Sequence, residues 1–113
     1  DAYNANPTSM RAALESFALL KEPHKMVILG DMFELGENSM KEHQAIADVT
    51  RELKFETIIL AGEHFSRTQT ESQQFKNFKE LQDHLIKNNI KNHAILIKGS
   101  RGMQLERALE FLN

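Results

Sequence analysis

Hydrophobic and polar residues alternate in blocks along the chain, and their spacing within each block distinguishes strands from helices. Short and almost wholly apolar runs are typical of strands that are covered on both faces, and they occupy residues 26–29, 57–61 and 94–97. Elsewhere apolar side chains recur every three or four residues, which predicts amphipathic helices over residues 7–22, 39–53, 79–88 and 103–112. The pattern therefore predicts a chain in which helices and buried strands alternate.

Local signals refine the ends of the first two helices. Asn6 is a favourable helix cap and Pro7 is tolerated at the first helical position, so the first helix is expected to begin there. Pro23 cannot continue a helix and is expected to end this segment. Ser39 and Glu42 have the spacing of a capping box, which predicts the start of the second helix.

The same spacing predicts which side chains form the core. Residues 64–78 are the least regular part of the chain, and their phenylalanines at 65, 75 and 78 predict a short helix and a weak strand anchored to that core. In the four clear helices the inward side chains are expected to be Met10, Ala13, Leu14, Phe17, Ile46, Val49, Leu53, Leu81, Leu85, Ile86, Met103, Leu105, Ala108, Leu109 and Leu112.

Alternating strands and helices predict an α/β fold, with a mainly parallel sheet and helices on both faces. Ligands of such folds bind beyond the carboxyl ends of the strands, where the strand-to-helix loops meet. The loops expected at this edge cover residues 1–6, 30–37, 62–64 and 98–102. The helix-to-strand connections, around residues 22–23, 54–55 and 88–92, are expected to be ordinary solvated turns.

Composition limits the classes of protein that fit. The chain has 113 residues, which suits one domain with a single core. Its 14 basic and 16 acidic residues give a net charge of -2, so charge provides no case for nucleic acid or an anionic membrane. Cysteine is absent, which excludes disulfides and thiolate metal sites and suits a cytoplasmic protein. No apolar run approaches the roughly 20 residues of a membrane span.

The segment Lys98-Gly99-Ser100-Arg101-Gly102 carries the clearest local chemistry. Two cations flank a small turn that is expected to open a helix, where backbone N–H groups and the helix dipole favour an anion. Arg101 could then hold a carboxylate or phosphate with two hydrogen bonds. The alternative is a glycine-containing turn with two solvated charges, and the residues alone leave both interpretations open.

The loop after the first strand presents two acids, Asp31 and Glu34, among apolar residues. These carboxylates could bind a metal or the ammonium group of a substrate. The commoner arrangement is structural, with Asp31 accepting hydrogen bonds from nearby backbone N–H groups and the apolar side chains packed beneath. The structural interpretation is the favoured one.

The histidines do not form a recognisable metal-binding pattern. His43 falls near the inward face of the second helix, which favours a core or cap role, whereas His64 follows a strand and is the histidine best placed for chemistry. The chain contains no phosphate-binding P-loop, no dinucleotide-binding glycine motif and no Ser-His-Asp set. No catalytic residue and no metal site is therefore assigned from the residues.

Taken in order, three motifs resemble one family. They are DAYNANP at residues 1–7, LGDMFELG at residues 29–36 and KGSR at residues 98–101. Their order and spacing are similar to those in the C-terminal domain of the Mur ligases, and most similar to the branch that adds D-alanyl-D-alanine. The resemblance covers essentially the whole chain and implies a Rossmann-like, doubly wound domain, residues 1–113, which is a fragment of a longer three-domain enzyme.

The resemblance also implies a reaction. Such ligases use ATP and Mg²⁺ to phosphorylate a carboxylate of UDP-MurNAc-tripeptide, and the amine of D-alanyl-D-alanine attacks the acyl phosphate through a tetrahedral intermediate. The P-loop and most magnesium ligands belong to the central domain, so the missing N-terminal and central domains are the expected partners. The fragment alone is expected to be inactive and to bind no cofactor tightly.

Matching positions to the family's motifs assigns roles to individual residues. Asp1 matches the aspartate that contacts the ATP ribose, and Tyr3, Asn4 and Asn6 are expected to flank the nucleotide or to fix the loop. The alternative for Asn6 is a role as the helix cap alone. The segment that faces D-alanyl-D-alanine is matched by Lys98, Ser100 and Arg101, and Asp31 and Glu34 could line the same cleft near the attacking amine. Two other functions remain possible: a receiver-like signalling domain, and a non-catalytic interaction module.

Overall fold

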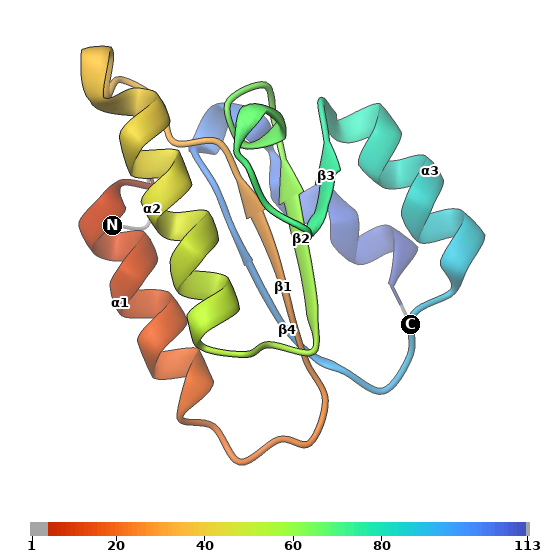
Figure 1. Ribbon diagram of the computed structural model, residues 1–113. Coiled ribbons are helices and arrows are strands. Elements are labelled where there is room, and N and C mark those ends of the chain that lie inside the picture. The colour runs from red at the N-terminus through yellow and green to blue at the C-terminus, as the bar shows by residue number, and fades with distance from the viewer. Residues whose placement is uncertain (1–4, 113) are drawn as a thin grey trace.

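A four-stranded parallel sheet between two layers of helices forms the centre of the computed structural model, which describes residues 5–112 (Figure 1). The strands lie in the order β3-β2-β1-β4. The α-helices and strands follow the chain as α1 (Pro7–Ala18), β1 (Lys25–Gly30), α2 (Ser39–Glu52), β2 (Thr57–Ala61), β3 (Gln73–Phe75), α3 (Phe78–Asn88) and β4 (Ala94–Lys98). Short 3-10 helices complete it as η1 (Gly36–Asn38), η2 (Phe65–Arg67), η3 (Arg101–Met103) and η4 (Leu105–Phe111).

The sheet separates two hydrophobic cores, as expected for helices on both faces. On β1, Val27 and Leu29 point into a core shared with α1 and α2, whereas Met26 and Ile28 point into a core shared with α3 and η4. All four side chains are completely buried. Successive side chains of a strand point to opposite faces, so an apolar run without alternation requires cover on both sides. The predicted α/β fold is confirmed (Figure 1).

The order of the strands creates a switch point between β1 and β4. The chain leaves β1 toward α2 on one face, and it leaves β4 toward η4 on the opposite face. Loops that diverge in this way leave a crevice at the carboxyl ends of the two strands, where α/β proteins bind ligands. The backbones meet closely here, because a Cβ atom on Gly99 would lie 2.9 Å from the Cα atom of Gly30.

Both helices begin at the predicted residue, but the cap predicted for the second helix does not form. The Asn6 side chain accepts a hydrogen bond from the Ser9 backbone N–H at 2.9 Å, and the Ser9 hydroxyl accepts one from the Asn6 N–H at 3.1 Å. The predicted capping box of Ser39 and Glu42 is wrong: η1 runs directly into α2, and Asn38 precedes the helix without a side-chain cap. Helix α1 also ends at Ala18, well before the expected stop.

The C-terminal segment is a correction to the predicted helix. It forms η3 and η4 in place of a single α-helix, with Gln104 in the left-handed region at φ +48° between them. A 3-10 helix has about three residues per turn, so Leu105 and Ala108 share its buried face and Leu109 does not. Leu109 is 61% exposed, and on α3 Ile86 is 58% exposed, so neither faces inward as expected.

Residues 64–78 form the short helix η2 and the three-residue strand β3, which confirms the prediction for this region. Within residues 5–112, no helix has both the length and the apolar character to cross a membrane.

The turns at the amino ends of the strands are largely exposed to solvent, as expected, and some of their side chains bond to one another. Glu56 accepts a hydrogen bond from His24 Nδ1 at 2.9 Å through one carboxylate oxygen and from His93 Nε2 at 2.9 Å through the other. The hydrogen bond from His24 is the main cause that lowers the pKa of the Glu56 carboxyl below its ordinary value. This cluster links the connections that precede β1, β2 and β4.

Candidate functional site

The candidate site lies at the carboxyl edge of the sheet, where segments far apart in the sequence meet. We call residues 31–35, which follow β1, the switch loop. The Ser100 backbone N–H donates to the Asp31 carbonyl oxygen at 2.9 Å, which joins the switch loop to the segment after β4. The start of α1 and the loop after β2 complete this edge (Figure 1).

Asp31 is buried, and its carboxylate is fully engaged inside the protein. One oxygen accepts hydrogen bonds from the His64 backbone N–H at 2.8 Å and from His64 Nδ1 at 3.0 Å. The other accepts from the Phe65 N–H at 2.9 Å. Gly62 runs close beside this carboxylate at φ +125°, with no room for a Cβ atom. Asp31 thus ties the loop after β1 to the loop after β2, which is the structural arrangement favoured from the sequence.

His43 is a completely buried histidine of α2 that holds the switch loop from below. Its Nε2 accepts a hydrogen bond from the Met32 backbone N–H at 2.9 Å, and its Nδ1 donates to the Ser39 carbonyl oxygen at 2.7 Å. Its ring stacks on His64 with 5.0 Å between centroids. Burial is the main cause that lowers the pKa of His43, so the neutral form is favoured. The expected core role of His43 is confirmed.

These hydrogen bonds decide whether the cluster suits a metal. In the part of the chain that the structure describes, Asp31, His43 and His64 form the one group whose ligand atoms lie within 4.8 Å of one another. The Nε2 lone pair of His43 and both oxygens of Asp31 face N–H donors, so an ion would have to displace those protons. Mg²⁺ moreover prefers oxygen ligands. The cluster does not fit Mg²⁺.

Ser100 supports the switch loop from the other side. Its side chain is 1% exposed, and its hydroxyl accepts a hydrogen bond from the Phe33 backbone N–H at 2.8 Å. The Phe33 ring covers Gly102, where a Cβ atom would lie 2.8 Å from the ring. Of the cations, Lys98 is half-buried at the end of β4 and Arg101 is exposed at the start of η3.

One part of the expected anion site has to be corrected. The segment after Lys98 was expected to open an α-helix whose dipole would favour an anion, but η3 is only three residues long. A helix dipole depends on aligned peptide units over several turns, so η3 contributes little. Any attraction of an anion to this segment must therefore come from the side chains of Lys98 and Arg101.

A groove between the starts of α1 and α2 brings together residues that the sequence assigned to different ligands. We call it the α1–α2 groove. Its larger part has a volume of about 670 Å³ and contains both Asn6 and Glu34. Glu34 is exposed and adopts the left-handed conformation at φ +62°. The other residues that line this part are Pro7, Thr8, Ser9, Ala12, Leu35, Asn38 and Glu42.

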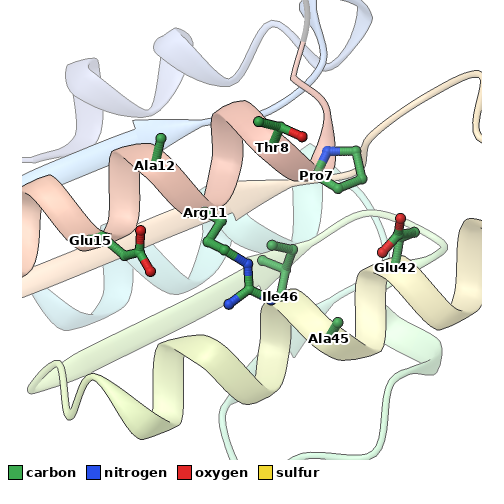
Figure 2. Close-up of a pocket in the computed structure, with 8 residues that line it drawn as sticks. All are labelled: Pro7, Thr8, Arg11, Ala12, Glu15, Glu42, Ala45 and Ile46. Atoms are coloured by element: carbon green, nitrogen blue, oxygen red, sulfur yellow. The ribbon is translucent and has the colours of Figure 1, made fainter.

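The groove continues along the helices into a second part of about 310 Å³ (Figure 2). Figure 2 shows Arg11 extending from α1 toward α2, with Glu42 near the start of α2 and Glu15 farther along α1. The two parts share Pro7, Thr8, Ala12 and Glu42. The wall of the groove is thus formed by the first turns of two helices and the end of the switch loop.

The expected nucleotide residues are only partly described. Asp1, Tyr3 and Asn4 lie outside the described residues. Asn6 lines the groove, but its side-chain oxygen caps α1. Its contribution as a cap is therefore visible, and a contact with a nucleotide stays a prediction.

Comparison with known proteins identifies the family. A family profile described as "Mur ligase, glutamate ligase domain" matches residues 1–101. The chain belongs to the Mur ligase family. One relative of this Mur ligase domain is the UDP-N-acetylmuramoyl-tripeptide--D-alanyl-D-alanine ligase of Rickettsia prowazekii (strain Madrid E), 32% identical over 98% of this chain and 26% of the relative.

Solved structures give the same relationship. The crystal structure of MurF from Acinetobacter baumannii superimposes with a TM-score of 0.80 at 30% identity, covering 96% of this chain and 25% of the other. MurF ligase from Thermotoga maritima, solved in complex with ADP, shares the fold with a TM-score of 0.75 at 23% identity, over 96% of this chain and 26% of the other. This Mur ligase domain therefore spans about a quarter of the length of the relatives that it matches.

Membership of the Mur ligase family removes the receiver-like alternative. The sequence predicted that the loops after β1, β2 and β4 of the Mur ligase domain lie at one edge of the sheet, and the structure places them there. It did not predict the side-chain hydrogen bonds that connect these loops. It treated Ser100 as a substrate contact, whereas the hydroxyl faces the switch loop. It also missed the link from His43 to Met32. A sequence signal was available: His43 lies at helical spacing from Ile46, which was expected to face inward, and a polar side chain on such a face needs a hydrogen-bond partner.

Proposed function

We propose that this chain is the C-terminal domain of an ATP-dependent ligase that joins D-alanyl-D-alanine to UDP-MurNAc-tripeptide in peptidoglycan synthesis. The observation that carries the proposal is the match of nearly the whole chain to ligases of that name, combined with a switch point whose loops contain the matching motifs. Because the chain spans about a quarter of those relatives, the N-terminal and central domains of the same protein are part of the proposal.

The reaction requires two transfers. A carboxylate oxygen of the tripeptide attacks the γ-phosphorus of ATP, and ADP leaves. The amine of D-alanyl-D-alanine then attacks the acyl carbon, loses a proton and forms a tetrahedral intermediate from which phosphate departs. Mg²⁺ would neutralise the phosphate charge, and since the Asp31–His43–His64 cluster does not suit that ion, its ligands are assigned to the central domain.

The residues of this chain divide into groups that contact ligands and groups that hold the contacts in place. We assign Asp1, Tyr3, Asn4 and Asn6 to the nucleotide side, with the Asp1 carboxylate accepting hydrogen bonds from the ribose. The ADP bound to MurF ligase from Thermotoga maritima supports the nucleotide as ligand, and a cytoplasmic location follows from the need for ATP.

On the side of the incoming dipeptide, we assign Lys98 and Arg101 to its carboxylate and Glu34 to its amine. The exposure of Arg101 and Glu34 supports these roles, because both side chains reach solvent at the switch point. Asp31 and Ser100 are assigned to holding the loops, since their side-chain oxygens accept hydrogen bonds from the protein. Asp31 and Ser100 are thus proposed to support the site and not to contact the substrate.

Steady-state kinetics of the full-length protein that carries this chain test the proposal. Replacing Arg101 by Ala is expected to raise KM for D-alanyl-D-alanine about 10-fold to 100-fold, the cost of a charged hydrogen bond, and to leave KM for ATP nearly unchanged. The substitution Asp1→Ala is expected to raise KM for ATP and to leave KM for D-alanyl-D-alanine nearly unchanged. Arg67→Ala is the matched control, because Arg67 is also exposed on a three-residue 3-10 helix.

The outcome discriminates between ligase and interaction module. A ligase forms ADP only when both the tripeptide nucleotide and D-alanyl-D-alanine are present. If ADP formation does not depend on the dipeptide, or if the Arg101 and Asp1 variants behave like the Arg67 control, the proposed function is wrong.

A further inference from the structure

The switch loop is held by two side chains that come from elements on opposite flanks of the switch point. The Met32 backbone N–H donates to His43 Nε2 on α2, and the next N–H, of Phe33, donates to Ser100 Oγ after β4. A buried N–H that loses its partner destabilises the conformation that buries it. The path of the loop therefore depends on these two acceptors.

Glu34 directly follows Met32 and Phe33 in the chain, and it adopts an unfavourable backbone conformation. Its φ of +62° lies in the left-handed region, which is unfavourable for a residue with a Cβ atom. Such conformations persist where the surrounding structure fixes them. The bonds to Met32 and Phe33 supply that fixation, and they deliver the Glu34 carboxylate to the α1–α2 groove.

The bond from Met32 requires one particular protonation state of His43. Nδ1 faces the Ser39 carbonyl oxygen, which can only accept, so Nδ1 carries the proton and Nε2 keeps the lone pair. A proton added to Nε2 would face the Met32 N–H, which is also a donor, and the bond would break. The loop as described therefore contains neutral His43.

The groups around His43 act in both directions on its pKa. Burial is the largest influence and lowers the pKa. The Asp31 carboxylate, 3.8 Å from Nε2, and Glu42 on the same helix raise it, as does the hydrogen bond to Ser39, whereas His64, stacked on the ring, lowers it. The Phe65 ring, which is edge-on to His43, carries no charge. The net direction is downward, so the loop is intact near neutral pH.

We infer that His43 is a positioning residue that sets Glu34 in the groove through the Met32 amide, and that adding a proton to His43 releases the switch loop. The consequence for ligation rests on the proposed function, in which Glu34 faces the incoming amine. Release of the loop then impairs the use of D-alanyl-D-alanine and not the use of ATP. The consequence for the loop itself does not depend on any activity.

Nuclear magnetic resonance of the ¹⁵N-labelled chain tests the loop directly. We expect the imidazole signals of His43 to identify Nδ1 as the protonated nitrogen at pH 7.5. On acidification, the hydrogen-exchange protection of the Met32 amide, corrected for intrinsic rates, should fall at least tenfold as His43 titrates. A proton on Nε2 at pH 7.5, or Met32 protection that does not follow the titration of His43, would overturn the inference.

Substitutions separate positioning from packing. His43→Gln places an amide oxygen where Nε2 accepts and cannot gain a proton, so Met32 should stay protected at every pH at which the chain is folded. His43→Leu removes the acceptor and should leave Met32 unprotected throughout. His84→Gln is the control, because His84 is a partly buried histidine on α3, across the sheet. If the Leu variant does not fold, the pH response of the Gln variant still decides.

Kinetics of the full-length protein test the consequence for ligation. We expect KM for D-alanyl-D-alanine to rise toward acid pH in the natural protein and to lose this rise in the Gln variant. The Leu variant should raise that KM about tenfold with KM for ATP unchanged, as expected when about 1.4 kcal/mol is lost. Equal pH profiles of this KM in the natural protein and the Gln variant would refute the inference that His43 positions the switch loop. Absence of any dipeptide-dependent ADP formation would instead refute the proposed function. The nuclear magnetic resonance experiment would then still test whether protonation of His43 releases the switch loop.

Discussion

Gly62 and Gly36 have positive φ angles for different reasons, and the difference lies in what surrounds each Cα atom. At Gly62 the backbone passes the Asp31 carboxylate so closely that a Cβ atom would overlap it, at φ +125°. At Gly36 φ is +59° and nothing lies within 4 Å of the position that a Cβ atom would take. Only Gly62 is therefore required by packing as well as by backbone conformation.

This contrast gives a prediction at the residue scale. Gly62→Ala should lower the free energy of unfolding by about 2–4 kcal/mol, because the new methyl group must displace the carboxylate that holds His64 and Phe65. Gly36→Ala should cost less than about 1 kcal/mol, since only the φ angle is unfavourable and the alanine restricts the unfolded chain. Urea unfolding of the two variants measures both values. Equal losses would show that packing against Asp31 does not matter.

At the scale of elements, the two helices that form the groove begin in different ways. Helix α1 starts with a complete capping box between Asn6 and Ser9, so its first turn is fixed by local sequence. Helix α2 begins without a side-chain cap, and its first residue, Ser39, is instead bonded through its carbonyl oxygen to buried His43. The cap of α1 was therefore predictable from local sequence, whereas α2 begins at the predicted residue without the predicted cap.

The cap on α1 also separates two roles of Asn6. Asn6→Ala should lower the free energy of unfolding by about 1 kcal/mol, the usual loss for a removed cap, whereas Asn6→Ser should keep most of the stability. In the full-length protein, a rise of KM for ATP in both variants would assign Asn6 to the nucleotide. A rise that follows stability, in the Ala variant alone, would assign it to the helix. Ser16→Ala, an exposed change on the same helix outside the groove, is the control.

At the scale of the whole molecule, the described residues offer an open edge that carries the residues proposed to contact ligands. The α1–α2 groove and the switch loop border solvent, and the P-loop expected of an ATP-dependent ligase is absent from the sequence. The chain covers about a quarter of its relatives. We therefore expect it to supply one wall of the site, with catalysis completed when the central domain closes on it.

A single wall should bind the nucleotide poorly. We expect calorimetric titration of the 113-residue chain with ATP and Mg²⁺ to give no binding tighter than about 1 mM, which corresponds to roughly 4 kcal/mol. The full-length protein under the same conditions is the comparison. Tight binding of ATP by the chain alone would contradict this division of the site between domains.

The amino-acid sequence by itself determined most of the elements, the parallel sheet and the edge at which the loops gather, but not the 3-10 helices of the C-terminal segment. It could do so because apolar periodicity, the Asn6 cap and strands without alternation reflect local geometry and two-sided burial. Only the tertiary structure decided what the polar side chains of those loops face. Asp31 bonds to residues more than thirty positions away, and Ser100 to a residue still farther off, so their partners cannot be read from spacing. Pairings of this kind depend on the order of the strands, which brings the ends of β1, β2 and β4 together.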